Sequence, residues 1–339
     1  MRAHHELPRG CVHTLWIDGE SLKGNWLGDP TRRRVDVYVP AGHDGRGLPL
    51  LVDLVGFRAG GPAHTNWKNF GENVPERLDR LIATGAMPPV VVAFPDCFTR
   101  LGGNQYVDSP AMGRWETFLI REMLPFVEGR LECGGDGRRG VFGKSSGGYG
   151  AMVHALRHGG SVWSAAASHS GDVGFEYLYH LGEFAGALRH LVDHGMSIEA
   201  FLRKFEAGPK AKDKDWHTLM LLAQAASFDP DPSQFYGIRL PVDLETCEVI
   251  DERWANWLRW DPLRMVDDRQ HQENLRNLKA FYIDCGDIDQ YNMVYGSRIM
   301  RRKLDAAGIP HTYEEFHDDH SSVDYRMDIS LPLLAKALS

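Results

Sequence analysis

The sequence predicts an α/β fold: a mostly parallel central sheet, helices on both faces and a helical insertion before the late strands. Short continuous apolar runs, such as LPLLVDLVGF, are typical of strands buried on both faces of a sheet. Segments with helical apolar spacing alternate with these runs, and the alternation stops between 171 and 277 before it resumes. Hydrophobic residues make up 43% of the 339 positions, which is enough for a large core.

The predicted elements follow one another regularly up to residue 170. They are strand 33–40, strand 48–57, helix 73–85, strand 88–96, helix 114–131, strand 138–143, helix 146–159 and strand 161–170. After residue 277 come strand 278–286, helix 293–308 with a glycine cap, strand 311–316 and helix 328–338. We therefore expect residues 1–170 and 278–339 to form one α/β core, and residues 171–277 to form a helical cap over the carboxyl edge of the sheet.

Charge and cysteine content disfavour several classes of protein. The net charge is −8, whereas nucleic-acid binders are more often basic, and the run Arg32–Arg34 is too short to suggest a binding patch. Five scattered cysteines without a CxxC pair argue against a disulfide framework and a zinc site. There is no secretory leader pattern and no apolar run near the roughly 18 residues of a membrane span. We expect a cytoplasmic protein without nucleic-acid or membrane partners, and homo-oligomerisation is left open.

The stretch RRGVFGKSSGGYGAM, at 138–152, fits two kinds of loop in part. Its Gly-Lys-Ser resembles the end of a phosphate-binding loop, but such a loop needs glycine at 138, where this chain has arginine. Gly143, Ser145 and Gly147 match the other pattern, G-x-S-x-G, in every position. In that pattern the serine occupies a strained turn between strand and helix, ready to act as a nucleophile.

Small neighbours distinguish the two adjacent serines of this turn. Residues two positions before and after the nucleophile crowd each other, and Ser145 has glycines at both places. Ser146 would have Lys144 on one side, so Ser145 is the better nucleophile. The backbone N–H of Ser146 would then lie at a helix N-terminus and face a developing oxyanion. The alternative is a glycine-rich turn with no catalytic role. The choice between the two depends on whether the sequence offers a base and an acid for the serine.

Carboxylates follow a late strand, where the acid of a Ser–acid–His order belongs on an α/β-hydrolase sheet. Asp284 lies within the strand, and we expect it to be structural. Asp289 lies in the loop beyond Gly286 and is the predicted acid, with Asp287 as the alternative.

Histidines surround the last predicted strand, in HTYEEFHDDHSS. His311 opens this strand and His317 ends it, while His320 lies in the following loop, 31 residues after Asp289. His320 is therefore the predicted base. Adjacent loop residues of the HDDH type do not converge easily on one ion, so we expect no metal, and the chemistry needs no cofactor.

A second oxyanion donor should come from the loop after an early buried strand. Gly56 allows a tight turn there, which would leave the backbone N–H of Phe57 facing the site. The alternative is a plain turn.

The chain resembles the putative-esterase family of α/β-hydrolases, which includes esterase D (S-formylglutathione hydrolase), the enterochelin esterases and the mycolyltransferase antigens. The likeness is carried by GFRA (56–59), PDCFTRLGGNQYVDSP (95–110), GKSSGGYGA (143–151), CGDIDQYN (285–292) and FHDDHSSVDYR (316–326). It implies Ser145 as nucleophile, Asp289 as acid, His320 as base, and Phe57 and Ser146 as oxyanion donors.

The chain departs from the family at two places. Asp319 stands where the family often has glycine before the histidine, and would either raise the basicity of His320 or replace Asp289. The insertion at 171–277 is long, so the choice of substrate cannot be carried over from compact members.

The resulting hypothesis is a serine carboxylic-ester hydrolase that acts through an acyl-enzyme on a small or aromatic ester. Aromatic residues of the insertion either line a pocket or, as we expect for most, form its own core: Tyr177, Tyr179, Trp216, Tyr236, Trp254, Trp257 and Trp260. Lys144 either favours anionic substrates or is simply tolerated, and His169 and Asp172 are more typical of strand-end packing than of a site. An acyltransferase with the same triad and a non-catalytic binding protein are the alternatives.

Overall fold

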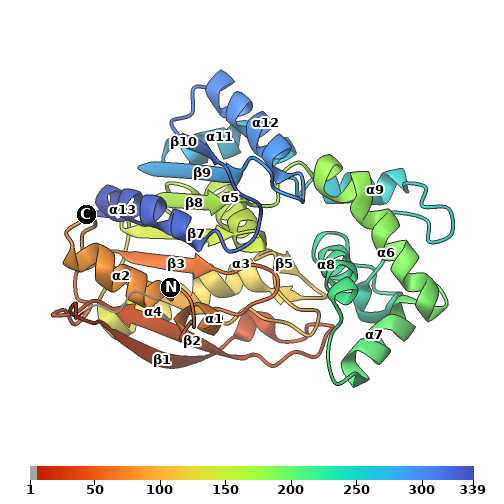
Figure 1. Ribbon diagram of the computed structural model, residues 1–339, viewed down its shortest axis with the longest axis horizontal. Coiled ribbons are helices and arrows are strands. Elements are labelled where there is room, and N and C mark those ends of the chain that lie inside the picture. Colours follow the sequence, from red (N-terminus) through yellow and green to blue (C-terminus); the bar gives the residue numbers. More distant parts are fainter. Residues whose placement is uncertain (1–5) are drawn as a thin grey trace.

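The computed structural model describes residues 6–339, so the N-terminal leader prediction falls partly outside it. Its main sheet has eight strands in the order β1-β2-β4-β3-β7-β8-β9-β10 (Figure 1). The strands are β1 (Cys11–Asp18), β2 (Arg32–Val39), β3 (Leu50–Leu54), β4 (Val91–Pro95), β7 (Arg139–Lys144), β8 (Ala165–His169), β9 (Ala280–Gly286) and β10 (Thr312–Phe316). A small hairpin adds β5 (Asp108–Ser109) and β6 (Gly113–Arg114). The pairs from β4 to β10 are parallel, and those of β2 with β1 and β4 are antiparallel, which confirms the mostly parallel sheet.

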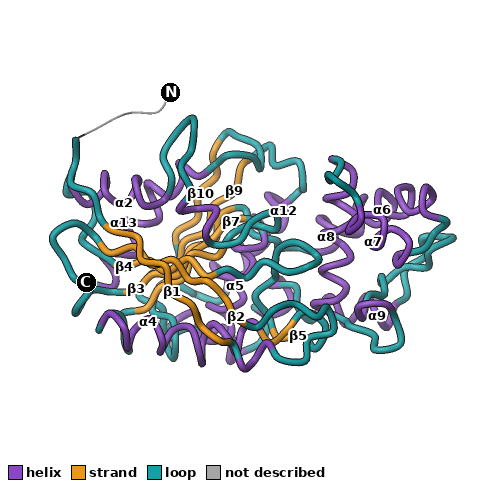
Figure 2. Tube along the Cα trace, turned by 90° about the horizontal axis from the view of Figure 1, so that it is seen from below, coloured by secondary structure: helices purple, strands orange, loops and turns teal. Residues whose placement is uncertain are grey.

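Helices cover both faces of the sheet, as predicted (Figure 2). One face packs against α2 (Val74–Ala83) and α13 (Met327–Leu338), with Phe142 and Tyr282 between them and the sheet. The other face packs against a long helical stretch that ends with α4 (Leu124–Leu131), and against α5 (Ser146–His158) and α12 (Met293–Ala306). Every residue of β3, β4 and β8 is buried, because both sides of these strands are covered. Short helices complete this part: η1 (Glu20–Leu22), α1 (Pro62–Thr65) and η6 (Asp324–Arg326).

The predicted single helix 114–131 has a more complex form. It consists of α3 (Trp115–Thr117), the π-helical turn η2 (Phe118–Met123) and α4, in direct succession. Pro125 cannot donate a hydrogen bond to the carbonyl of Arg121 and would clash with it in a regular helix. The wider turn, in which the N–H of Leu124 bonds the carbonyl of Leu119, accommodates the proline.

The chain between β8 and β9 is helical. It contains η3 (Glu176–Glu183), α6 (Phe184–Leu191), η4 (Val192–His194), α7 (Ile198–Ala207), α8 (Asp213–Phe228), η5 (Phe235–Gly237), α9 (Asp251–Leu258), α10 (Pro262–Met265) and α11 (Arg269–Arg276). Figures 1 and 2 show α6 to α9 beside the sheet, whereas α10 and α11 pack on α5. Tyr179, Trp254 and Trp257 belong to the buried core of this segment. Among residues 6–339, no helix has both the length and the apolar character needed to cross a bilayer.

A buried polar network fastens α13 to the sheet. His169 Nδ1 lies 2.8 Å from Asp284 Oδ1, and its Nε2 lies 2.8 Å from Ser330 Oγ. Arg326 Nε donates to the second Asp284 oxygen at 2.9 Å. Burial alone would raise the pKa of Asp284, but His169 and Arg326 outweigh it and hold this pKa below its usual value. His169 and Asp284 therefore have the structural surroundings that were expected of them.

Candidate active site

Ser145 occupies a sharp turn between β7 and α5. Its backbone has φ +58° and ψ −126°, a conformation that a non-glycine residue keeps only when its surroundings hold it. The N–H of Ser145 donates to the carbonyl of His169 at 3.0 Å, and its carbonyl accepts from the N–H of Tyr149 at 2.8 Å. The turn thus carries the strain expected of a nucleophile elbow.

Gly143 and Gly147 lie where the turn and β3 meet. A Cβ on Gly147 would lie 1.7 Å from the carbonyl oxygen of Leu54, and a Cβ on Gly143 would lie 2.2 Å from the same atom. The Gly143 Cβ would also come within 2.5 Å of the Gly147 carbonyl. Neither position has room for a side chain, because three backbone segments converge there.

We predict that Gly147→Ala destabilises the protein by more than about 4 kcal/mol, the range of severe core disruption, or prevents folding. The new methyl group must displace the backbone of β3, which lies at the centre of the sheet. Urea unfolding followed by circular dichroism measures the effect. Gly129→Ala in α4 is the matched control, because nothing lies within 4 Å of its Cβ, and it should gain roughly 0.5–1 kcal/mol. Equal midpoints for Gly147→Ala and the wild type would contradict the steric argument.

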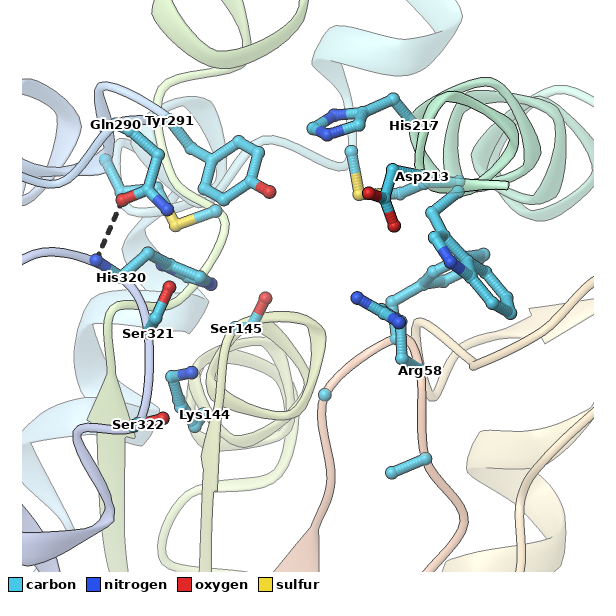
Figure 3. A pocket seen from close by; sticks show the side chains of 16 residues that line it. Arg58, Lys144, Ser145, Asp213, His217, Gln290, Tyr291, His320, Ser321 and Ser322 are labelled. Carbon is cyan, nitrogen blue, oxygen red and sulfur yellow. Dashed lines mark hydrogen bonds between the residues drawn. The ribbon is translucent and has the colours of Figure 1, made fainter. Parts of the chain in front are cut away.

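His320 and Asp289 meet in the loops after β10 and β9. His320 Nδ1 lies 2.7 Å from Asp289 Oδ2, and the other Asp289 oxygen accepts the N–H of Tyr291 at 2.9 Å. The side chain of Gln290 accepts the N–H of His320 at 2.9 Å, and the Tyr291 ring packs edge-on against the imidazole. Figure 3 shows the far end of the imidazole and the Ser145 hydroxyl pointing toward each other. This arrangement can move a proton from the serine to the imidazole.

The two alternative carboxylates are engaged elsewhere. Asp319 Oδ1 accepts the N–H of Ser321 at 2.6 Å and so fixes a turn. Asp287 pairs with His317 at 3.1 Å, and the His317 side chain is 82% exposed. Of the three candidates, the structure places only Asp289 against the imidazole. Among residues 6–339, no three His, Cys, Asp or Glu side chains are arranged to hold a metal ion.

The predicted oxyanion segments flank Ser145. Ser146 is the first residue of α5, so its N–H is one of the unsatisfied donors of the helix N-terminus. Gly56 and Phe57 line the cavity, and a Cβ on Gly56 would lie 3.5 Å from the Cβ of Ser145. The Phe57 ring packs against Gly102, and its backbone packs against Gly103. The loop after β3 is thereby held close to Ser145.

A cavity of about 840 Å³ opens above these residues. It is lined by Gly56, Phe57, Arg58, Ala59, Lys144, Ser145, Asp213, Trp216, His217, Met220, Gln290, Tyr291, Met293, His320, Ser321 and Ser322. One wall comes from α8, whose contributing residues have the spacing i, i+3, i+4, i+7 of a single helix face. The helical spacing of these residues can be read from the sequence, but nothing in the sequence shows that this face of α8 meets the loops after β3, β9 and β10.

Aromatic and charged groups determine the character of the cavity. The Arg58 guanidinium stacks over the Trp216 ring at 4.6 Å, and the His217 and Tyr291 rings lie 5.7 Å apart. The hydrogen bond with Glu183 raises the pKa of His217, whereas burial lowers the pKa of Lys144. The cavity therefore combines flat apolar surfaces with a few polar groups, as small-molecule sites commonly do.

Known proteins resemble this chain over most of its length. The family model described as "Putative esterase" matches residues 30–333. An esterase of Mycobacterium tuberculosis H37Rv is 25% identical over 251 residues, which are 68% of this chain and 42% of that protein. The chain thus spans less than half the length of this relative.

Solved structures share the fold at low sequence identity. A ferulic acid esterase has 19% identity and a TM-score of 0.63, with 97% of this chain and 99% of that one covered. An S-formylglutathione hydrolase from Agrobacterium tumefaciens has 18% identity and a TM-score of 0.59, with 97% and 96% covered. A fluorophosphonate-binding serine hydrolase of Staphylococcus aureus has 13% identity and a TM-score of 0.57, with 98% and 99% covered. These similarities confirm the α/β-hydrolase fold.

Proposed function

The chain belongs to the putative esterase family, and from this premise we propose that it is a serine carboxylic-ester hydrolase that acts through an acyl-enzyme. The observation that carries the proposal is the 2.7 Å contact of Asp289 with His320, whose ring points at a serine on a strained turn. A serine hydroxyl is a weak nucleophile and needs such an oriented base.

In the proposed reaction, His320 takes the proton of Ser145 as the hydroxyl attacks the ester carbonyl. The N–H groups of Ser146 and Phe57 stabilise the oxyanion, each by a factor of roughly 100 to 1,000 in rate. The imidazolium then gives its proton to the departing alcohol, and an acyl-Ser145 remains. Water, deprotonated by His320, releases the acid and restores the serine.

The test is labelling with an alkyl fluorophosphonate followed by peptide mass spectrometry, alongside turnover of 4-nitrophenyl acetate. We expect a single adduct on Ser145 and none in Ser145→Ala. An adduct on another serine, or none at all together with no turnover, would refute the proposal. Added alcohol acceptors that divert the acyl group from water would favour an acyltransferase with the same residues.

We further propose that the ester is small or aromatic. The Arg58–Trp216 stack and the His217–Tyr291 pair border the cavity and offer flat faces to a planar group. A solved relative is named a ferulic acid esterase, whose acid is aromatic.

Trp216→Ala should therefore raise KM for a 4-nitrophenyl cinnamate about 10-fold, because the lost aromatic contact is worth roughly 1 kcal/mol or more. KM for the acetate ester should change less than 3-fold. Trp16→Ala is the matched control: Trp16 also stacks with an arginine, Arg32, but on the edge strand β1. Equal changes for both esters would show that the ring does not contact the acyl group.

A further inference from the structure

We propose that Gln105 and Asp172 are positioning residues of this site. A buried hydrogen-bond chain runs from Asp172 through Gln105 to Ser146 and keeps the Ser146 N–H directed at the carbonyl oxygen of the reacting ester. The inference rests on the proposed function, because it assigns the residues that support one of its oxyanion donors. Neither residue lines the cavity.

The chain of contacts joins three segments that are distant in the sequence. Gln105, in the loop between β4 and β5, lies with its amide nitrogen 3.0 Å from Ser146 Oγ. Asp172, just after β8, accepts the Tyr179 hydroxyl through Oδ2 at 3.0 Å. These four side chains are at most 2% exposed, so water does not satisfy their polar atoms.

The orientation of the Gln105 amide decides how the chain is connected. The amide is also within hydrogen-bonding reach of the Asp172 carboxylate. With its nitrogen on Ser146, however, Gln105 Oε1 and Asp172 Oδ1 are both left buried without a donor. A half-turn of the amide exchanges its oxygen and nitrogen and gives the oxygen a donor in the Ser146 hydroxyl. We assign this orientation, which also turns the amide nitrogen into a donor for Asp172. Ser146 then donates to Gln105, and Gln105 donates to Asp172.

A carboxylate suits the end of this chain better than an amide of the same shape. Asp172 accepts from Tyr179 on one oxygen and from Gln105 on the other, whereas asparagine has only one acceptor. Burial raises the pKa of Asp172 to about 6, and the hydrogen bonds from Tyr179 and Gln105 act in the opposite direction by favouring the carboxylate.

Close packing keeps the chain in place next to the turn. A Cβ on Gly148 would lie 2.8 Å from the His169 carbonyl and 2.9 Å from the Gly171 Cα, so the segment before Asp172 rests directly on α5. The residue after Gln105 reaches the other oxyanion segment, because the Tyr106 hydroxyl donates to the Val55 carbonyl at 2.6 Å. One loop thus fastens both proposed donors, and the Ser145 turn keeps its strained shape between them.

The experiment uses Ser146→Ala, Gln105→Met and Asp172→Asn in the full chain. For each variant we expect kcat for 4-nitrophenyl acetate to fall about 10- to 100-fold, the scale of a misplaced reacting group, with KM within 3-fold. Affinity for phenylboronic acid, whose adduct is tetrahedral and anionic, should fall by the same factor. Because the three residues act in one chain, Gln105→Met/Asp172→Asn should lose no more than the worse single variant.

Tyr38→Phe is the matched control, because Tyr38 forms a buried hydrogen bond with Asp79 at 2.8 Å on β2, away from the cavity. It should lower Tm and leave kcat unchanged. Unchanged kcat and boronate affinity in folded Ser146→Ala would overturn the inference. Ser146→Ala is the smallest of the three changes, so its result alone tests the inference if the other two variants fail to fold. Full activity in Ser145→Ala would instead refute the proposed function, and this result is distinguishable from a failure of the present inference alone.

Discussion

Ser145→Ala is expected to lower kcat for 4-nitrophenyl acetate by about 10⁴- to 10⁶-fold, as removal of a hydrolase nucleophile does. Alanine carries a Cβ as serine does, so the positive φ at this position costs about the same, and the strained turn and the cavity should persist. KM should change little, because the hydroxyl contributes to the transition state rather than to binding. Residual catalysis of about 10³- to 10⁴-fold over water should remain, supplied by the oxyanion donors and by binding.

The matched control for this variant is Ser161→Ala. Ser161 lies just beyond α5, and its hydroxyl bonds the carbonyl of His158 on the surface. This variant should keep wild-type kcat. A loss of less than 10-fold in Ser145→Ala would mean that another group attacks the ester.

Asp289→Asn is expected to lower kcat about 10⁴-fold, as loss of the triad carboxylate does elsewhere. The amide would favour the wrong tautomer of His320, because an amide N–H opposite Nδ1 leaves the proton on Nε2, where the base must accept one. The measurement is kcat and kcat/KM from pH 5 to 9.

Asp287→Asn and Asp319→Asn serve as comparisons, because their carboxylates contact His317 and the Ser321 N–H instead. Each should change kcat less than 3-fold. A larger loss in Asp319→Asn than in Asp289→Asn would reassign the acid.

The sequence reveals most of the core because its strands are buried on both sides. Continuous apolar runs predict β3 and β4 within a few residues, and the predictions for β7 and β9 are equally close, although the predicted strand 161–170 begins only at Ala165. The edge strand β1, at 11–18, was not predicted. Most of its residues are exposed, so no apolar run or alternation marks it, and only pairing with β2 makes it a strand.

The catalytic candidates were easier to locate than their surroundings. Gly143, Ser145 and Gly147 form a local pattern, and the order of the fold limits where a base and an acid can lie. Asp287, Asp289 and Asp319 differ only in where their loops point, which sequence spacing does not determine. Gln105 and the α8 wall depend on segments about 40 and 70 residues from Ser145, and no local pattern indicates that they meet.

The polar network that fastens α13 has the same connectivity as a serine protease triad: Ser330 Oγ to His169, and His169 to Asp284, at 2.8 Å each. A template built on hydrogen-bond distances alone would therefore accept this buried set. Ser330 and Asp284 have no exposed surface and His169 has 2%, so no carbonyl carbon can reach that serine. The proposed catalytic set differs from this buried network in two respects: its serine borders a cavity, and that serine lies on a strained turn. Reactive probes can detect that difference, and bond lengths cannot.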